Sequence, residues 1–211
     1  MNKKIVIIGS GGHAKVIIDI FNSTKKYKII GVTSPDKIKK TISGIPVLGD
    51  DSILLDLFNK GVRCAFIAIG DCKLRNKIFE NAKKIGFKIV NAISPSSNIS
   101  RSVKIGSGVA IMPGVSINVD SIIEDNVIIN TNTSIDHDNI IKKSVHVAPG
   151  CSLAGNVTIG EGTFLGIGCK IIPKIFVGKW SIIGAGTVVI KDIPSNVTVF
   201  GVPGKVIKNN N

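Results

Sequence analysis

An aliphatic residue at every sixth position runs through the second half of the chain. From Ile93 to Val189 each of these positions holds Ile, Val or Leu, with no insertion between repeats. A period of six fits neither an α-helix nor an alternating strand. It fits a coil of short flat strands joined by corners, with one large aliphatic side chain per strand pointing into a shared interior. The seventeen positions are Ile93, Ile99, Ile105, Ile111, Ile117, Ile123, Ile129, Ile135, Ile141, Val147, Leu153, Ile159, Leu165, Ile171, Val177, Ile183 and Val189.

Two other positions of the repeat support such a coil. The residue four places after each aliphatic one is small or aliphatic in most repeats, and the residue directly after it is often Gly. We expect these glycines at sharp corners whose backbone conformation only Gly adopts at little cost. They are Gly106, Gly160, Gly166, Gly178 and Gly184. The pattern predicts a parallel β-helix in which each rung buries the next.

Before residue 92 the pattern changes to alternating strands and helices. Apolar runs predict strands at 4–8, 28–32 and 63–69, and helical periodicity predicts helices at 13–23, 51–58 and 74–85. This alternation predicts a small parallel α/β domain of Rossmann-like type over residues 1–91. The β-helix domain is expected over residues 92–211, with 197–208 folding back as a strand or extension.

A glycine-rich turn, Gly9-Ser10-Gly11-Gly12-His13-Ala14, follows the first strand and opens the first helix. In this setting backbone amides can bind a phosphate. A dinucleotide fingerprint also needs an acidic residue after the second strand, where this chain has Val32-Thr33-Ser34. Nicotinamide binding is therefore disfavoured. The turn either binds the phosphates of a nucleotide or nucleotide sugar, or is a tight turn that binds nothing.

Composition narrows the classes of partner. The 211 residues carry a net charge of +13, but the lysines are scattered and aromatic residues are few, so nucleic acid is not expected as a partner. The lysines either form a solvated surface or bind the phosphates of a small ligand. No apolar run reaches the ~20 residues of a membrane helix, and the chain start does not resemble a signal peptide, which predicts a cytoplasmic protein without membrane attachment. The four cysteines lack CxxC spacing, so no metal site is expected; Cys151 and Cys169 should stack in the core.

The three histidines are His13, His137 and His146. If three strands complete one coil, residues 18 apart stack at ~4.8 Å. Gly155 then lies directly above His137, whereas His146 lies half a coil away. Both histidines can serve one site only if a second subunit brings its own face alongside. The count therefore predicts a cyclic homotrimer with active sites between subunits.

His137 lies between Asp136 and Asp138. A neutral imidazole can take a proton from an attacking amine or hydroxyl, and a nearby carboxylate raises its basicity. Neighbours on a flat strand point in opposite directions, so Asp138 can assist His137 only if a corner lies there. The missing side chain of Gly155 leaves space beside His137 and an approachable amide for an oxyanion. The alternative is an inert surface histidine.

With these features the whole chain resembles bacterial sugar acyltransferases of the left-handed β-helix class that carry an N-terminal nucleotide-sugar-binding domain. The resemblance rests on the turn at residues 9–13, on Phe66-Ile67-Ala68-Ile69-Gly70 with Arg75, and on the hexapeptides. Further matching motifs are Asn130-Thr131, Ile135-Asp136-His137-Asp138, Ser144-Val145-His146-Val147, Cys151-x-x-Ala154-Gly155-Asn156-Val157 and Gly201-Val202-Pro203-Gly204-Lys205.

The resemblance implies roles for individual residues. It implies that His137 is the general base and that Asp138 raises its basicity. Acetyl-CoA would lie against His146 and the backbone near Gly155, Ile167 and Gly184. The uridine nucleotide would lie against Gly11, Gly12, His13 and Gly70, and Asn130 would contact the acceptor sugar.

The activity implied is acetyl-CoA-dependent N-acetylation of a UDP-4-amino-4-deoxy sugar by direct attack. An O-acetyltransferase of the sialic acid pathway remains an alternative, as does a non-catalytic nucleotide-sugar sensor. A β-helix carbonic anhydrase would need three metal-binding histidines, and the repeat holds only two. The acceptor sugar and its pathway are left open.

Overall fold

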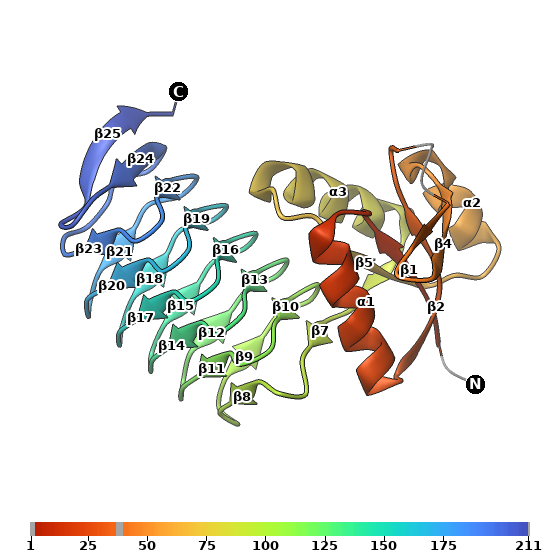
Figure 1. Cartoon of the computed structure of the whole chain (residues 1–211), viewed down its shortest axis with the longest axis horizontal. Helices are drawn as coiled ribbons and strands as arrows, with labels where there is room; N and C mark the ends of the chain where they lie inside the picture. The colour runs from red at the N-terminus through yellow and green to blue at the C-terminus, as the bar shows by residue number, and fades with distance from the viewer. Residues whose placement is uncertain (1–2, 37–39, 211) are drawn as a thin grey trace. The chain divides into compact units, whose positions relative to one another are not determined.

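The computed structural model describes residues 3–36 and 40–210, which form two compact units, Met1–Pro95 and Ser96–Asn211 (Figure 1). The division falls within the first hexapeptide repeat, four residues beyond the predicted boundary at residue 91.

The first unit contains a six-stranded sheet in the order β3-β4-β2-β1-β5-β6. All neighbours are parallel except β3 and β4, which form an antiparallel hairpin. The strands are β1 (Lys3–Ile8), β2 (Tyr27–Thr33), β3 (Thr41–Ile42), β4 (Ile45–Gly49), β5 (Cys64–Ile67) and β6 (Lys88–Ile89), followed by β7 (Ala92–Ile93). The α/β prediction is confirmed.

Helices cover both faces of the central strands. They are α1 (Gly12–Thr24), η1 (Asp51–Ile53), α2 (Leu54–Asn59) and α3 (Cys72–Ile85). Val6 and Ile8 of β1 pack in one apolar cluster with Leu54 of α2 and Phe79 of α3. The ring of Phe66 in β5 meets Phe21 of α1 edge to face, with ring centroids 5.7 Å apart. The four apolar residues of β1 are therefore fully buried, as expected for a central parallel strand.

Two details of this unit differ from the sequence prediction. The hairpin of β3 and β4 was not predicted, although Ser43 and Gly44 between its strands both have positive φ, as a two-residue hairpin turn requires. Helix α3 begins at Cys72 rather than at Leu74, because the side chain of Asp71 caps it by accepting a hydrogen bond from the Leu74 amide.

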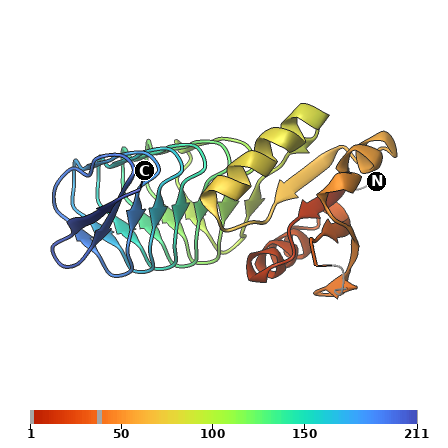
Figure 2. The same ribbon diagram turned by 90° about the horizontal axis from the view of Figure 1, so that it is seen from above.

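The second unit is a left-handed parallel β-helix, as predicted, with three sheets that we name walls A, B and C (Figures 1 and 2). Wall A contains β10 (Ala110–Ile111), β13 (Ile128–Ile129), β16 (His146–Val147), β19 (Phe164–Leu165), β22 (Ile182–Ile183) and β24 (Val197–Phe200). Wall B contains β8 (Asn98–Ile99), β11 (Ser116–Ile117), β14 (Ser134–Ile135), β17 (Ser152–Leu153), β20 (Lys170–Ile171) and β23 (Val188–Val189). Wall C contains β9 (Lys104–Ile105), β12 (Ile122–Ile123), β15 (Ile140–Ile141), β18 (Thr158–Ile159) and β21 (Phe176–Val177).

Pairing between rungs follows the predicted spacing of 18 residues. Ile117 pairs with Ile135 in wall B, and Ile129 pairs with Val147 in wall A. Apart from the ends of the coil the periodic aliphatic residues are buried, and so are Cys151 and Cys169. At the carboxyl end β24 pairs parallel with β22, and β25 (Lys205–Asn209) folds back antiparallel on β24.

The corners of the coil correct one prediction. For the aliphatic positions from Ile105 to Ile183, the left-handed backbone conformation falls three residues after the aliphatic residue, not directly after it. The glycines directly after the aliphatic residues do not have left-handed φ values; a Cβ on Gly160 would instead lie 2.5 Å from the amide nitrogen of Lys179 in the next rung. They are glycines because the rungs approach closely. The left-handed residues are Gly108, Gly114, Asp120, Asn126, Asn132, Asp138, Ser144, Gly150, Asn156, Gly162, Gly168, Lys174, Trp180 and Gly186.

Candidate active site

His137 lies on the corner that joins β14 in wall B to β15 in wall C, which we name the B–C corner of this rung. Asp138 is one of the left-handed residues, with φ of 59°. The alternation of a flat strand is therefore interrupted between the two residues. His137 and Asp138 consequently point to the same side, which meets the condition for Asp138 to assist the histidine.

The two side chains form a hydrogen-bonded pair. His137 Nδ1 lies 2.7 Å from Asp138 Oδ2, and an ionised carboxylate only accepts, so Nδ1–H donates and Nε2 carries the lone pair. This hydrogen bond is the main cause that raises the pKa of His137 above the ordinary histidine value of 6.5. Both side chains are about half exposed, at 52% and 53%. The pair presents a basic nitrogen to solvent.

Asp136 fixes the backbone of the same corner. Its Oδ1 accepts a hydrogen bond from the amide of His137 at 2.9 Å and another from Asn118 Nδ2 at 2.9 Å. The bonds from Asn118 and from the His137 amide lower the pKa of Asp136. Its negative charge also contributes to the raised pKa of His137. Sequence reasoning assigned no role to Asp136 or Asn118.

Gly155 lies directly above His137, as the count of 18 residues predicted. A Cβ on Gly155 would lie 2.5 Å from Cε1 and Nε2 of the His137 ring. Any residue other than glycine at position 155 would therefore displace the imidazole. The Asn156 amide donates to the carbonyl of His137 at 2.9 Å, which joins the two corners. The Gly155 N–H has no backbone acceptor within residues 3–36 and 40–210.

His146 lies on β16 of wall A and is buried. Its ring meets that of Phe164 edge to face, with centroids 5.2 Å apart. Asn130 Nδ2 lies 3.3 Å from His146 Nε2 and can only donate, so Nε2 of His146 accepts. The Oδ1 of Asn130 accepts from the Thr131 amide at 2.8 Å. Asn130 and His146, which were predicted to contact the acceptor and acetyl-CoA respectively, are thus direct neighbours.

Ile167 and Gly184 lie on corners that follow strands of wall A, as Asn130 does. The side chain of Ile167 is 62% exposed. The Gly184 amide donates to the Val199 carbonyl at 2.8 Å, and a Cβ on Gly184 would collide with the ring of Phe200. Within the β-helix the predicted residues therefore form two groups. His137, Asp138 and Gly155 share the B–C corners, and Asn130, His146, Ile167 and Gly184 share wall A and its corners.

The glycine-rich turn lies in the first unit. Gly9 has φ of 114°, and a Cβ there would lie 2.8 Å from the Ala68 carbonyl oxygen, so the turn packs closely on the segment after β5. A Cβ on Gly11 or Gly12 would meet nothing within 4 Å, which leaves the amino end of α1 open. His13 lies in the first turn of α1.

The structure places an acidic residue beside the end of β2, where the sequence has Thr33 and Ser34. Thr33 Oγ1 donates to Asp51 Oδ1 at 2.6 Å, and Ser10 Oγ of the glycine-rich turn donates to Ser34 Oγ at 2.6 Å. Asp51 comes from η1, 18 residues further along the chain. A shallow groove of about 400 Å³ adjoins this position, and its lining residues are Ser34, Asp36, Lys40, Val47, Leu48, Gly49 and Asp50. Sequence reasoning missed Asp51 because it searched only the residues that directly follow β2.

Arg75 holds the segment that contains Gly70. Its guanidinium is 1% exposed and donates to the carbonyls of Ile69 at 3.2 Å and Gly70 at 2.8 Å. Burial lowers the pKa of Arg75. The side chain fixes the two carbonyls at the carboxyl end of β5, near the close contact between Gly9 and Ala68.

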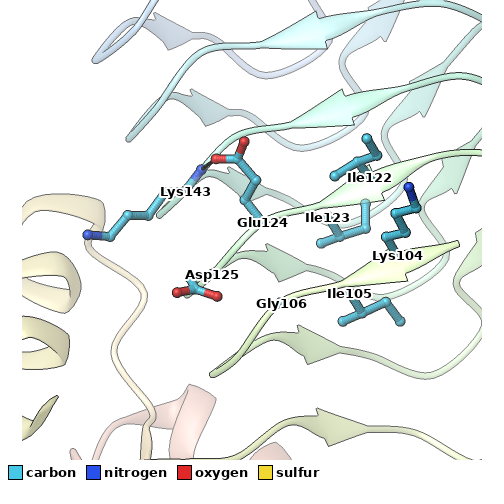
Figure 3. A pocket seen from close by; sticks show the side chains of 8 residues that line it. All are labelled: Lys104, Ile105, Gly106, Ile122, Ile123, Glu124, Asp125 and Lys143. Atoms are coloured by element: carbon cyan, nitrogen blue, oxygen red, sulfur yellow. Dashed lines mark hydrogen bonds between the residues drawn. The ribbon is translucent and has the colours of Figure 1, made fainter.

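A second groove, of about 460 Å³, lies on wall C and its following corner (Figure 3). Its lining includes three isoleucines and Glu124. Glu124 accepts from the Lys143 amide at 2.9 Å and pairs with Lys142 Nζ at 2.8 Å. Asp125 Oδ1 accepts from the amide and hydroxyl of Ser107. The groove contains no residue of the predicted site.

In residues 3–36 and 40–210 no three His, Cys, Asp or Glu side chains gather as a metal site would require. No helix in that part of the chain is long and apolar enough to cross a membrane.

The PglD N-terminal domain family matches residues 4–82. PerB from Caulobacter crescentus, solved in complex with CoA and GDP-perosamine, is 43% identical with a TM-score of 0.94, and the match covers 97% of each chain. The chain belongs to the bacterial sugar acyltransferases with a left-handed β-helix.

Other known proteins are also similar to this chain. The acetyltransferase domain of PglB from Neisseria gonorrhoeae, solved in complex with acetyl coenzyme A, is 34% identical with a TM-score of 0.92, over 98% of this chain and 100% of that one. The UDP-N-acetylbacillosamine N-acetyltransferase of Bacillus subtilis (strain 168) is 35% identical over 112 residues, which are 52% of this chain and 51% of that protein. An uncharacterized protein of Acanthamoeba polyphaga mimivirus is matched over 24% of its length. The chain thus spans about half or less of these curated relatives.

Proposed function

We propose that the protein is an acetyl-CoA-dependent N-acetyltransferase that acts on a UDP-4-amino-4-deoxy sugar. The observation that carries the proposal is the His137–Asp138 pair on its corner, with Gly155 stacked on the imidazole. Three relatives support the class of reaction: PerB is solved with CoA, the PglB domain is solved with acetyl coenzyme A, and the Bacillus subtilis protein is described as an N-acetyltransferase.

The proposed chemistry is direct transfer. The sugar amine attacks the thioester carbonyl of acetyl-CoA, and His137 Nε2 takes the proton that the amine loses. Asp138 holds Nδ1–H and stabilises the imidazolium that forms. The Gly155 N–H donates to the oxyanion of the tetrahedral intermediate. When the C–S bond breaks, the CoA thiolate leaves and the imidazolium returns the proton to it.

The remaining residues bind the two substrates in this proposal. His146, Ile167 and Gly184 contact acetyl-CoA, and Asn130, which is bonded to His146, contacts the acceptor sugar. Gly11, Gly12, His13 and Gly70 bind the nucleotide; the open amino end of α1 supports this, because helix amides there can bind phosphate. We propose a cytoplasmic homotrimer with active sites between subunits.

A second candidate substrate is a GDP-linked amino sugar. It is favoured by PerB, which is 43% identical and was solved with GDP-perosamine. The two candidates share the acetyl transfer and differ in the nucleotide.

An acetyl-transfer assay with UDP-4-amino sugars, GDP-4-amino sugars and sialic acids tests the proposal. We expect transfer from acetyl-CoA to the amine of one of the nucleotide sugars. Acetylation of a hydroxyl of sialic acid would support the O-acetyltransferase instead. Thermal stabilisation by nucleotide sugars but not by acetyl-CoA, without turnover, would support the sensor.

Replacement of the proposed base gives the first prediction. His137→Ala should lower kcat by about a hundredfold to ten-thousandfold, because proton removal from the amine loses its catalyst. The side chain is half exposed, so the melting temperature should change little. Steady-state kinetics and a thermal melt measure both. Near-normal kcat in this variant would contradict the assignment of the base.

A further inference from the structure

Buried polar residues recur at one position of the hexapeptide repeat of the β-helix. This is the inner corner position, four residues after the periodic aliphatic residue, where Val, Ile or Cys is usual. From Ser121 onwards the polar residues at this position are almost completely buried. They are Ser121, Thr133, Asn139, Thr163, Ser181 and Thr187.

Several inner corner residues make the same hydrogen bond. Thr133 donates to the Ala148 carbonyl at 3.1 Å and Thr163 donates to the Gly178 carbonyl at 2.7 Å, in each case 15 residues further on. Ser121 donates to Asp136 at the same separation. This bond links one corner to the corner of the next rung.

Asn139 makes that bond and two more. Its Nδ2 lies 3.0 Å from the Ala154 carbonyl, which is 15 residues further on, and also 2.7 Å from the Asp136 carbonyl and 3.2 Å from the His137 carbonyl. One buried amide thus contacts the backbone of the proposed base and the backbone of the rung above it.

The Ala154 carbonyl and the Gly155 N–H belong to one peptide unit. In a planar trans peptide the N–H points opposite to the carbonyl. Because the Ala154 carbonyl points inward to Asn139, the Gly155 N–H points out of the coil; the His137 ring packs against the same glycine. Rotation of this peptide unit would turn the Gly155 N–H away from its outward direction.

We propose that Asn139 is a positioning residue that fixes the Gly155 amide relative to His137, so that the oxyanion donor and the base act on the same tetrahedral intermediate. This inference rests on the proposed function.

The rest of the Asn139 side chain argues against a purely stabilising role. Its Oδ1 is buried and has no hydrogen-bond partner within the described part of the chain. A buried acceptor without a partner destabilises a fold. Residues 103, 121, 139 and 157 are spaced by 18 and therefore stack on one another at the B–C corners. Two of these four residues are Val103 and Val157, so an aliphatic residue fits this position of the coil.

Two variants of nearly equal shape test the proposal. Asn139→Val removes all three hydrogen bonds, and Asn139→Thr supplies a hydroxyl that should donate to Ala154 as Thr163 donates to Gly178. Asn139→Val should lower kcat by about tenfold to a hundredfold, because the oxyanion donor is misplaced. The KM for acetyl-CoA, the pH midpoint of kcat and the melting temperature should stay close to those of the unmodified protein. Asn139→Thr should recover most of the lost kcat.

Thr163→Val is the matched control, since it removes the equivalent bond at a corner that follows wall C, where no residue of the proposed mechanism lies. It should leave kcat unchanged. An amide resonance gives a readout that needs no turnover: the ¹⁵N and ¹H shifts of Gly155 should move in Asn139→Val and return towards their original values in Asn139→Thr.

These outcomes separate the two proposals. If the unmodified protein acetylates no member of the sugar panel, the proposed function fails, while the Gly155 resonance still tests the link to Asn139. Full kcat in Asn139→Val would overturn the positioning role, as would an unmoved Gly155 resonance. Equal losses of kcat in the Val and Thr variants, together with matching losses in melting temperature, would show a structural role instead.

Discussion

At the scale of single residues, the basicity of His137 depends on the backbone of its neighbour. Asp138 can reach the imidazole because it adopts a left-handed conformation, which Asp and Asn tolerate better than most residues. The carboxylate then holds Nδ1–H at 2.7 Å and leaves Nε2 to accept a proton. Corner geometry and acid–base chemistry are therefore determined together.

This pair predicts a pH dependence. The base is active when neutral, so kcat should rise with pH as His137 loses its proton and level off above its pKa, which lies above 6.5. Asp138→Asn removes the main cause of the raised pKa while keeping a residue that accepts the left-handed conformation. The midpoint of the rise should move to lower pH, and the plateau should fall because a weaker base removes the proton less effectively. A pH profile of kcat measures both changes.

Two other variants make this experiment specific. Asp138→Glu retains a carboxylate and should keep more of the raised midpoint than Asp138→Asn. Glu124→Gln removes a carboxylate from the same position of the repeat as Asp136, but after wall C, and should leave the profile unchanged. If the pH midpoint of kcat is unchanged in Asp138→Asn, a group other than the His137–Asp138 pair causes the loss of kcat at low pH.

The sequence predicted some of these contacts and not others, for a physical reason. Counting 18 residues placed Gly155 over His137, because pairing between rungs is strictly periodic. The alternation of side chains along a flat strand identified the condition on Asp138. The sequence pattern did not reveal every contact. It could not find Asn139, because the convergence of three carbonyls on one amide depends on peptide orientations within two corners. Asp51 was missed for a similar reason, since tertiary folding brings it to β2.

At the scale of elements, the β-helix uses glycine in two distinct ways. Gly150 occupies the left-handed corner position with φ of 68°, and a Cβ there would meet nothing within 4 Å. Gly160 has no left-handed φ, but a Cβ there would lie 2.5 Å from the backbone of the next rung. The sequence analysis explained Gly160 by conformational freedom, because the sequence alone cannot separate backbone strain from close approach.

Substitution should separate the two roles. Gly150→Ala should lower the free energy of unfolding by about 1–2 kcal/mol through left-handed strain, and Gly160→Ala by about 1–3 kcal/mol through overpacking. Asn at position 150 should recover part of the loss, since Asn126, Asn132 and Asn156 adopt this conformation at equivalent positions. Asn at position 160 should be worse than Ala because its side chain is larger. Urea unfolding midpoints measure all four. Recovery by Asn at 160 would contradict the close-approach explanation.

At the scale of the whole molecule, the proposed chemistry and the proposed nucleotide binding lie in different compact units. The alternating pattern of the first unit and the period of six in the second predicted this organisation before any residue was assigned a role. The periodic half was predictable in detail, because a single register defines every rung. The α/β half was less so, because its hairpin and its Asp51–Thr33 contact depend on tertiary packing.

A final prediction concerns the trimer. His137 lies on a corner that follows wall B and His146 on wall A, so a site that uses both must take them from adjacent subunits. Subunits that carry His137→Ala and subunits that carry His146→Ala should each have low activity alone. After mixing under conditions that allow subunit exchange, about a quarter of the sites in a cyclic trimer would receive both histidines intact. Activity should therefore reappear in the mixture.

The mixing experiment also separates this arrangement from its alternative. If each site takes both residues from one chain, exchange cannot restore activity, because every subunit lacks one histidine. Light scattering should give a mass of three chains, each of 22.3 kDa, before and after mixing. Trimers that exchange subunits but stay inactive would contradict the site between subunits. The assignment of His137 as the base would remain, since it rests on the corner within one chain.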